Sequence, residues 1–233
     1  MNHSAGRLDY IEHHTFLTGP LVPGSVVIDG GANIGAFASA MVGRFPCRVV
    51  AVEPHPKIFD AIPAHERIHK VACALGGSDG RRRLQFDANP EAARLNDAAV
   101  GEGVMTDVRR LETIFHENNV NEVALVKLDI EGSELEVLES LSDEVLGRIA
   151  QFAIEFHDFA GYLTTPQVEA ALAKLEQRGW TAIRFSRRFY GDTLIVNRRL
   201  VDLSNRDVWW MRHVSRNIRG IGRMVRSRLG GRS

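Results

Sequence analysis

The regular alternation of strand-like and helix-like segments constrains the fold of this chain most strongly. Between residue 25 and about residue 180, short apolar runs rich in β-branched residues alternate with segments of helical periodicity. This pattern is typical of βαβ units around a parallel sheet. It predicts strands at 26–29, 48–53, 69–74, 124–130 and 151–156, and helices at 34–44, 56–62, 108–118, 133–141 and 166–178.

The alternation changes near residue 180, where "TAIRFS" and "DTLIVN" are separated by only the five residues "RRFYG". Two strand-like runs so close together predict a hairpin, and therefore an antiparallel strand in a mostly parallel sheet. An ordinary dinucleotide-binding fold keeps helical crossovers to its end. The sequence thus predicts a related but different α/β sheet.

The length of 233 residues predicts one α/β domain with appendages: an N-terminal segment (1–24) available for substrate or lid contacts, the domain itself (25–200), and a C-terminal tail (204–233). The segment 85–106 shows no steady period and is expected to be an irregular insertion. Cys47 and Cys73 lie in apolar runs, so we expect buried free thiols. With no apolar leader and no run of about 20 apolar residues, a cytoplasmic location is expected.

A glycine-rich turn follows the first predicted strand in "VVIDGGANIGAF". Glycines permit a tight turn and a close backbone approach, and asparagine tolerates left-handed geometry. The helix that follows offers free N–H groups to an anionic ligand, which leaves a pyrophosphate and the carboxylate of a methionine moiety as alternatives. The spacing is GxNxG rather than the GxGxxG of dinucleotide sites, and the acid before the turn can face a ligand ammonium. The candidate cofactor-binding residues here are Asp29, Gly30, Gly31, Asn33 and Gly35.

The second predicted strand ends in Glu53, followed by Pro54. The proline stops the strand, and the carboxylate can accept hydrogen bonds from ribose hydroxyls at the edge where open α/β sheets bind ligands. Both residues are therefore candidates for cofactor binding.

Charged residues gather at the ends of the fourth and fifth predicted strands. "VKLDIEGSELEVL" carries Lys127, Asp129 and Glu131, and "AIEFH" carries Glu155 and His157. Burying such charges is costly unless they pair with one another or with a charged ligand, so we expect a catalytic role. Ser133 and Glu136 have the spacing of a capping box, which predicts a structural role for Glu136.

Taken in order, "VVIDGGANIGAF", "VVAVEPHP", "ACALGGSDG", "VKLDIEGSELEVL" and "IEFH" resemble the FkbM family of S-adenosylmethionine-dependent methyltransferases. The resemblance implies a class I methyltransferase fold, a Rossmann-like sheet of seven mostly parallel strands with a terminal antiparallel hairpin. It implies S-adenosylmethionine as cofactor and O-methylation of a hydroxyl on a sugar, glycolipid or other natural-product acceptor. It also assigns Ala74 and Leu75 to the adenine-lining segment and Glu134 to the family's charged block.

For the chemistry, we expect His157 to be the general base that takes the acceptor's proton, oriented by Glu155 or Asp129. We expect no metal, because Asp129, Glu131 and Glu155 are the only obvious ligands and Lys127 can neutralise one of them. The acceptor is expected to be chosen by the segment 85–106 and by N-terminal residues such as Tyr10, Glu12, His13 and His14, with the C-terminal tail as a further candidate. Oligomeric state is not readable from the sequence.

The C-terminal tail differs in charge from the rest of the chain. Residues 206–233 carry eight arginines and one aspartate, which gives this segment a net charge of +7. Trp210, Val214, Ile218, Ile221 and Val225 form an apolar stripe opposite the arginines, which predicts a basic amphipathic helix. Packing on the domain and peripheral contact with an anionic membrane are the two main interpretations. The functional alternative is a nucleic-acid-associated methyltransferase or binding module that uses this tail, although a nucleic-acid partner is not expected.

Overall fold

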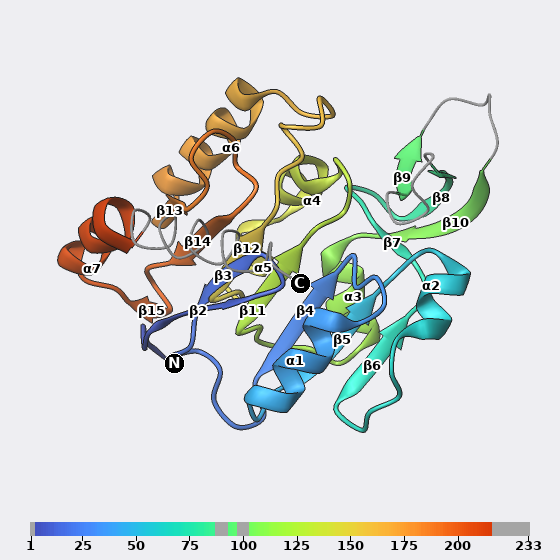
Figure 1. Ribbon diagram of the computed structural model, residues 1–233, viewed down its shortest axis with the longest axis horizontal. Coiled ribbons are helices and arrows are strands. Elements are labelled where there is room, and N and C mark those ends of the chain that lie inside the picture. The colour runs from blue at the N-terminus through green and yellow to red at the C-terminus, as the bar shows by residue number, and fades with distance from the viewer. Residues whose placement is uncertain (1–2, 87–92, 97–102, 216–233) are drawn as a thin grey trace, which may run out of the picture.

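A seven-stranded sheet forms the centre of the computed structural model, which describes residues 3–86, 93–96 and 103–215 (Figure 1). The strand order is β13-β14-β12-β11-β4-β5-β6. The bounds are β4 (Val26–Gly30), β5 (Arg48–Val52), β6 (Ile68–Val71), β11 (Leu125–Leu128), β12 (Gln151–Ile154), β13 (Trp180–Arg184) and β14 (Thr193–Asn197).

The direction of the strands agrees with the sequence pattern. The run β12-β11-β4-β5-β6 is parallel throughout, whereas β14 is antiparallel to both β12 and β13. The predicted terminal hairpin and the predicted mostly parallel sheet are therefore confirmed.

Alternate residues of the strands point to opposite faces of the sheet, as the period of two requires. Val26 and Ile28 pack with helices on one face, while Val27 packs on the other face against α1 and the N-terminal hairpin. The helices are α1 (Ala36–Arg44), α2 (Pro56–Ala61), α3 (Leu111–Glu117), α4 (Glu134–Ser140), α5 (Asp143–Leu146) and α6 (Thr165–Gln177). All five predicted helices are present, but the one expected at 108–118 begins three residues late.

The N-terminal segment is built into the same core. Strand β1 (His3–Ser4) pairs with β15 (Val201–Asp202), and β2 (Leu8–Ile11) forms a hairpin with β3 (His14–Leu17). All four residues of β3 are buried. Asp192 accepts hydrogen bonds from the Thr15 amide (3.1 Å) and hydroxyl (2.8 Å). The Gln151 side chain bonds both the N–H and the C=O of Leu17 at 2.8 Å. These buried bonds hold β3 beside β12 and β14.

A second, four-stranded sheet corrects the expectation of an irregular segment at 85–106. Its order is β7-β10-β8-β9, with bounds β7 (Ala74–Leu75), β8 (Gly80–Phe86), β9 (Ala93–Asn96) and β10 (Val104–Arg109). The predicted strand at 69–74 is likewise divided, because β6 belongs to the central sheet and β7 to this one. Strand β8 is stabilised by pairing with its antiparallel neighbours β9 and β10, so these strands need no regular alternation of apolar residues in their own sequence.

The described start of the tail is helix α7 (Asn205–Trp210), capped by Ser204 and Asp207, followed by a π-helical turn (Met211–Ser215). Met211 is buried, whereas Trp210, the first residue of the predicted apolar stripe, is half exposed. The stripe positions Ile218, Ile221 and Val225 lie outside the described residues. Within the described ranges, no helix has the length and apolar character needed to span a bilayer. Cys47 and Cys73 are buried free thiols, as predicted.

Candidate active site

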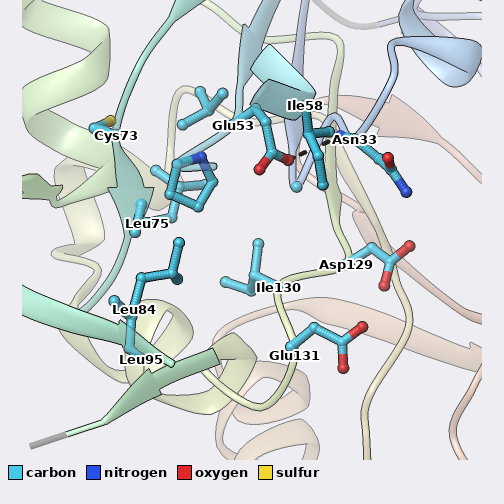
Figure 2. A pocket seen from close by; sticks show the side chains of 14 residues that line it. Asn33, Glu53, Ile58, Cys73, Leu75, Leu84, Leu95, Asp129, Ile130 and Glu131 are labelled. Carbon is cyan, nitrogen blue, oxygen red and sulfur yellow. Dashed lines mark hydrogen bonds between the residues drawn. The ribbon is translucent and has the colours of Figure 1, made fainter. Parts of the chain in front are cut away.

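A cavity opens at the carboxyl ends of β4, β5 and β11, where the second sheet meets the central one (Figure 2). Apolar side chains of the second sheet lie on one side of it and carboxylates from the end of β11 on the other. Its lining comprises Gly31, Asn33, Val52, Glu53, Pro54, Ile58, Cys73, Ala74, Leu75, Leu84, Leu95, Asp129, Ile130 and Glu131.

The glycine turn after β4 has the backbone geometry that its sequence predicts. Gly31, Asn33 and Gly35 have φ values of 72°, 49° and 80°, all in the left-handed region. A Cβ at Gly31 would lie 1.9 Å from the carbonyl oxygen of Asp129, so no other residue fits there. The turn is therefore packed directly against the end of β11.

Glu53 is fixed at the end of β5 by backbone donors. The amide of Asn33 donates to its Oε2 (2.9 Å) and the amide of His55 donates to its Oε1 (2.8 Å). The side chain is buried, and this burial raises the pKa of Glu53 while the two amide bonds oppose the rise. Each carboxylate oxygen keeps a second acceptor position for a ligand hydroxyl.

The apolar wall of the cavity comes from several segments. Ala74 and Leu75 line it as expected from the resemblance, with the buried thiol of Cys73, whose pKa burial raises to about 12, beside them. Sequence reasoning missed Ile58, Leu84 and Leu95. The last two come from β8 and β9, the strands that local periodicity did not reveal.

Asp29 has a different environment from the predicted one. It is fully buried, and the Nζ atom of Lys127 lies 3.1 Å from its Oδ1, so the lysine rather than a ligand ammonium balances its charge. Lys127 also donates to the carbonyl of Gly31 at 2.7 Å. Burial acts to lower the pKa of Lys127, but Asp29 and Asp129 outweigh it and raise that pKa. Asp29 is therefore linked to the glycine turn through Lys127 and does not line the cavity. Gly30 is also outside the cavity lining and packs against Leu75.

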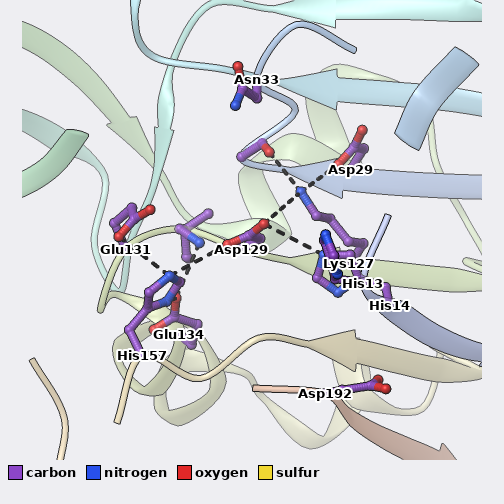
Figure 3. Close-up of polar contacts among 12 residues, drawn as sticks. His13, His14, Asp29, Asn33, Lys127, Asp129, Glu131, Glu134, His157 and Asp192 are labelled. Atoms are coloured by element: carbon purple, nitrogen blue, oxygen red, sulfur yellow. Dashed lines mark hydrogen bonds and ion pairs between the residues drawn. The ribbon is translucent and has the colours of Figure 1, made fainter. Parts of the chain in front are cut away.

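Asp129 is the centre of a charged cluster at the edge of the cavity (Figure 3). Its Oδ2 lies 3.6 Å from Nε2 of His14 and 3.8 Å from Nζ of Lys127, and its Oδ1 lies 3.6 Å from Nε2 of His157. Burial acts to raise the pKa of Asp129, but the Lys127 ammonium and the His14 contact hold it well below its ordinary value. Asp129 is therefore a carboxylate at neutral pH.

His157 is held by Glu134, not by the predicted Glu155 or by Asp129 alone. Glu134 is fully buried and its Oε1 lies 2.7 Å from Nδ1 of His157, while Nε2 lies 3.4 Å from Glu131. Burial acts to lower the pKa of His157, but Glu134 and the other acids raise it to about 9. A ring nitrogen that carries positive charge at neutral pH cannot take a proton, which argues against His157 as the general base.

The capping box predicted for Ser133 and Glu136 at the start of α4 is absent. Ser133 makes no side-chain cap, and Oε1 of Glu134 instead accepts the amides of Ile130 and Gly132, each at 3.2 Å. Glu136 does have a structural role, because Nη1 of Arg82 donates to both of its carboxylate oxygens at 2.9 Å and the Gly77 amide donates to its Oε1.

Glu155 lies just beyond Asp129, at the end of β12. Its carboxylate makes no hydrogen bond or ion pair within the described residues, although an oxygen of it lies within 4.8 Å of ligand atoms of both His14 and Asp129. Burial, with a contribution from Asp129, raises the pKa of Glu155 to about 7. The site thus brings together all five predicted catalytic residues, and it adds His14 and Glu134.

The order of the sheet and the reversed strand β14 separate this fold from dinucleotide-binding sheets and place it among the class I methyltransferases. Residues 29–180 match the family model described as Methyltransferase FkbM domain, and the chain belongs to that family. Its cofactor is S-adenosylmethionine.

Related proteins are known from several organisms. The chain is 32% identical to 31-O-demethyl-FK506 methyltransferase FkbM of Streptomyces tacrolimicus, over 70% of this chain and 75% of that protein. It is 27% identical to hexuronic acid methyltransferase AglP of Haloferax volcanii, over 65% and 66% respectively. Among solved structures, it is similar to M. capricolum TrmK in complex with S-adenosylhomocysteine, with a TM-score of 0.45 and 11% identity over 81% of this chain and 70% of that one.

The residues of the cavity fit this cofactor. Glu53 has free acceptor positions suited to ribose hydroxyls, and the walls formed by Leu75, Leu84 and Ile58 suit an adenine ring. Asp129 and Glu131 bring negative charge to the side where a cationic methionine end would need it.

Proposed function

We propose that this protein transfers the methyl group of S-adenosylmethionine to a hydroxyl oxygen of a sugar, glycolipid or other natural-product acceptor. The observation that carries the proposal is Glu155, a carboxylate without an ionic or hydrogen-bonded partner in the described structure, next to the carboxylate that borders the cofactor cavity. An alcohol needs such a group, because its proton must leave as the oxygen is methylated.

S-adenosylmethionine supplies an electrophilic methyl group on a positively charged sulfur. When the methyl group passes to the acceptor oxygen and S-adenosylhomocysteine is left, a carboxylate oxygen of Glu155 would take the hydroxyl proton. We assign the proton to Glu155 instead of His157, since Nε2 of His157 lies between two acids that keep positive charge on it.

Other residues of the cluster position the reacting groups. Lys127 ties the glycine turn to Asp29 and Asp129, and so fixes the cofactor side of the site relative to the acceptor side. Glu134 holds the His157 ring in one orientation. Such fixed geometry supplies much of the rate in an in-line displacement.

The names of the relatives support the choice of acceptor class. One is named for a demethylated natural product and another for a hexuronic acid. Both names fit a small-molecule or glycan acceptor that presents a hydroxyl group.

The test is isotopic labelling with the purified protein. Extracts of the source organism would be incubated with cofactor that carries a deuterated methyl group, and products would be examined by mass spectrometry and NMR. We expect label on an oxygen with the wild type and with Glu139→Gln, a surface control, and loss of that product with Glu155→Gln. Label on carbon or nitrogen, or equal product from Glu155→Gln, would contradict the proposal.

A further inference from the structure

We propose that Asp129, Glu131 and His157 form a binding site for one divalent metal ion at the border between the cofactor cavity and the acceptor side. The three residues offer ligand atoms that all lie within 4.8 Å of one another. They come from the segment after β11 and the segment after β12, which meet at the carboxyl edge of the sheet (Figure 3).

The orientation of His157 is that of a metal ligand. Because an ionised carboxylate only accepts hydrogen bonds, the short contact with Glu134 places a hydrogen on Nδ1. Nε2 then faces Oδ1 of Asp129 at 3.6 Å and Oε2 of Glu131 at 3.4 Å. A carboxylate on the far nitrogen is the usual outer partner of a metal-bound histidine. Two acids that face Nε2 favour a positive charge there, and a divalent ion would replace the proton that Nε2 otherwise carries, because a metal-bound imidazole nitrogen is deprotonated.

His14 provides a second, independent observation. Its side chain is 1% exposed, its Nδ1 has no hydrogen-bond partner, and its Nε2 points at Oδ2 of Asp129 from 3.6 Å. An imidazole is costly to bury without hydrogen bonds. Its position is explained if Asp129 is a metal ligand, because ligating carboxylates are themselves held by neighbouring donors. His14 then holds Oδ2 and leaves Oδ1 facing Glu131 and His157.

The balance of charge also favours a cation. Lys127 lies closer to Asp29 (3.1 Å) than to Asp129 (3.8 Å), so Asp29 engages most of its charge. Asp129 and Glu134 both face His157, and these two carboxylates exceed the single positive charge of a protonated imidazole. The sequence-based expectation of no metal rested on Lys127 and on a purely carboxylate ligand set. The structure changes both premises, because Lys127 is engaged by Asp29 and because a histidine joins the acids.

Two carboxylates with one imidazole suit a cation of intermediate character. Oxygen ligands favour Mg²⁺ and Mn²⁺, whereas imidazole favours later first-row metals, so Mn²⁺ is the best single match to the mixed set. If the proposed function holds, a hydroxyl oxygen bound to this ion would lose its proton to Glu155 more readily.

In the experiment, the chelator-treated full chain is titrated with Mn²⁺, and the concentration of free Mn²⁺ is measured at each step by electron paramagnetic resonance. It uses no acceptor and no turnover, so its result is independent of the proposed function. The variants are Glu131→Gln, His157→Gln and Glu139→Gln, the last an exposed carboxylate on α4 that pairs with surface Lys174. Circular dichroism and a cooperative thermal unfolding transition confirm that each variant is folded, because Glu131 also lines the cavity and its loss can alter cofactor affinity.

We expect one Mn²⁺ per chain for the wild type and Glu139→Gln, and binding at least about 10-fold weaker for the two site variants. If His157→Gln does not fold, Glu131→Gln decides the matter, since the Glu131 side chain is 25% exposed and its loss leaves the core intact. Failure of the wild type to bind Mn²⁺ stoichiometrically, or equal binding by wild type and Glu131→Gln, would overturn the proposal.

Discussion

The two sides of the carboxyl edge are built differently. On the cofactor side, the glycine turn and Glu53 are fixed by backbone amides and tight backbone contacts, and apolar side chains complete the wall. On the acceptor side, the cluster around Asp129 is held by other charged side chains, which come from β3, α4 and the ends of β11 and β12. The first side has the form of a ligand pocket, whereas the second is a cluster of ionisable side chains that face one another.

This difference predicts that substitutions on the two sides have separable effects. A change on the cofactor side should weaken cofactor binding with little effect on turnover at saturation. Changes in the cluster should lower turnover, or stability where a buried charge is left alone. The following substitutions test this division.

Lys127→Met should have the largest effect, because it leaves Asp29 buried without a counter-charge. We expect a loss of about 3–5 kcal/mol in the free energy of unfolding, measured by chemical denaturation. Lys174→Met, which removes an exposed pair with Glu139, is the matched control and should cost at most about 1 kcal/mol. Equal small losses for both variants would mean that Lys127 does not connect the two sides.

Glu155→Gln should lower kcat by about 10²–10³-fold, because the amide cannot take the acceptor's proton. The KM for the cofactor should stay the same, since Glu155 does not line the cofactor cavity. Steady-state kinetics with the acceptor found by isotopic labelling would measure both. A kcat close to that of the wild type would remove Glu155 from the chemistry.

Glu53→Gln should weaken binding of S-adenosylhomocysteine by about 10- to 100-fold, because one acceptor oxygen becomes a donor facing backbone N–H groups. Turnover at saturating cofactor should change little. Glu66→Gln, at an exposed position, serves as the control. Unchanged affinity in Glu53→Gln would show that the ligand does not use this carboxylate.

Leu95→Ala should have the smallest effect, about a 3- to 5-fold loss of affinity for S-adenosylhomocysteine, because Leu95 is only one part of the apolar wall. Val104→Ala, on the same small sheet but outside this cavity, should leave the affinity unchanged. Calorimetry can resolve this difference. An equal change in both variants would place the effect in the small sheet instead of the cavity.

The contrast between the two sides also explains what the sequence could predict. Gly31, Asn33 and Glu53 were predictable, because a turn and a strand end are local features whose geometry depends on adjacent residues. The partners of the cluster were not. Glu134 meets His157, and His14 meets Asp129, only after the strands have been placed side by side and β3 has been fixed by buried polar bonds.

The second sheet was missed for a similar reason. Strands β8 and β9 are stabilised by pairing with each other and with β10, so their residues need no strong period of their own. As a result, Leu95 was assigned to a segment expected to choose the acceptor, whereas it lines the same cavity as Glu53 and Leu75. The seven-stranded fold itself was predictable, because the βα alternation and the final hairpin are both local patterns.

The most direct test of the division is a calorimetric titration of S-adenosylhomocysteine into the wild type, Glu53→Gln and Glu155→Gln under one set of conditions. The separation of cofactor binding from chemistry predicts a loss of at least about 10-fold for Glu53→Gln and wild-type affinity for Glu155→Gln. A Glu155→Gln variant that loses as much affinity as Glu53→Gln would contradict it.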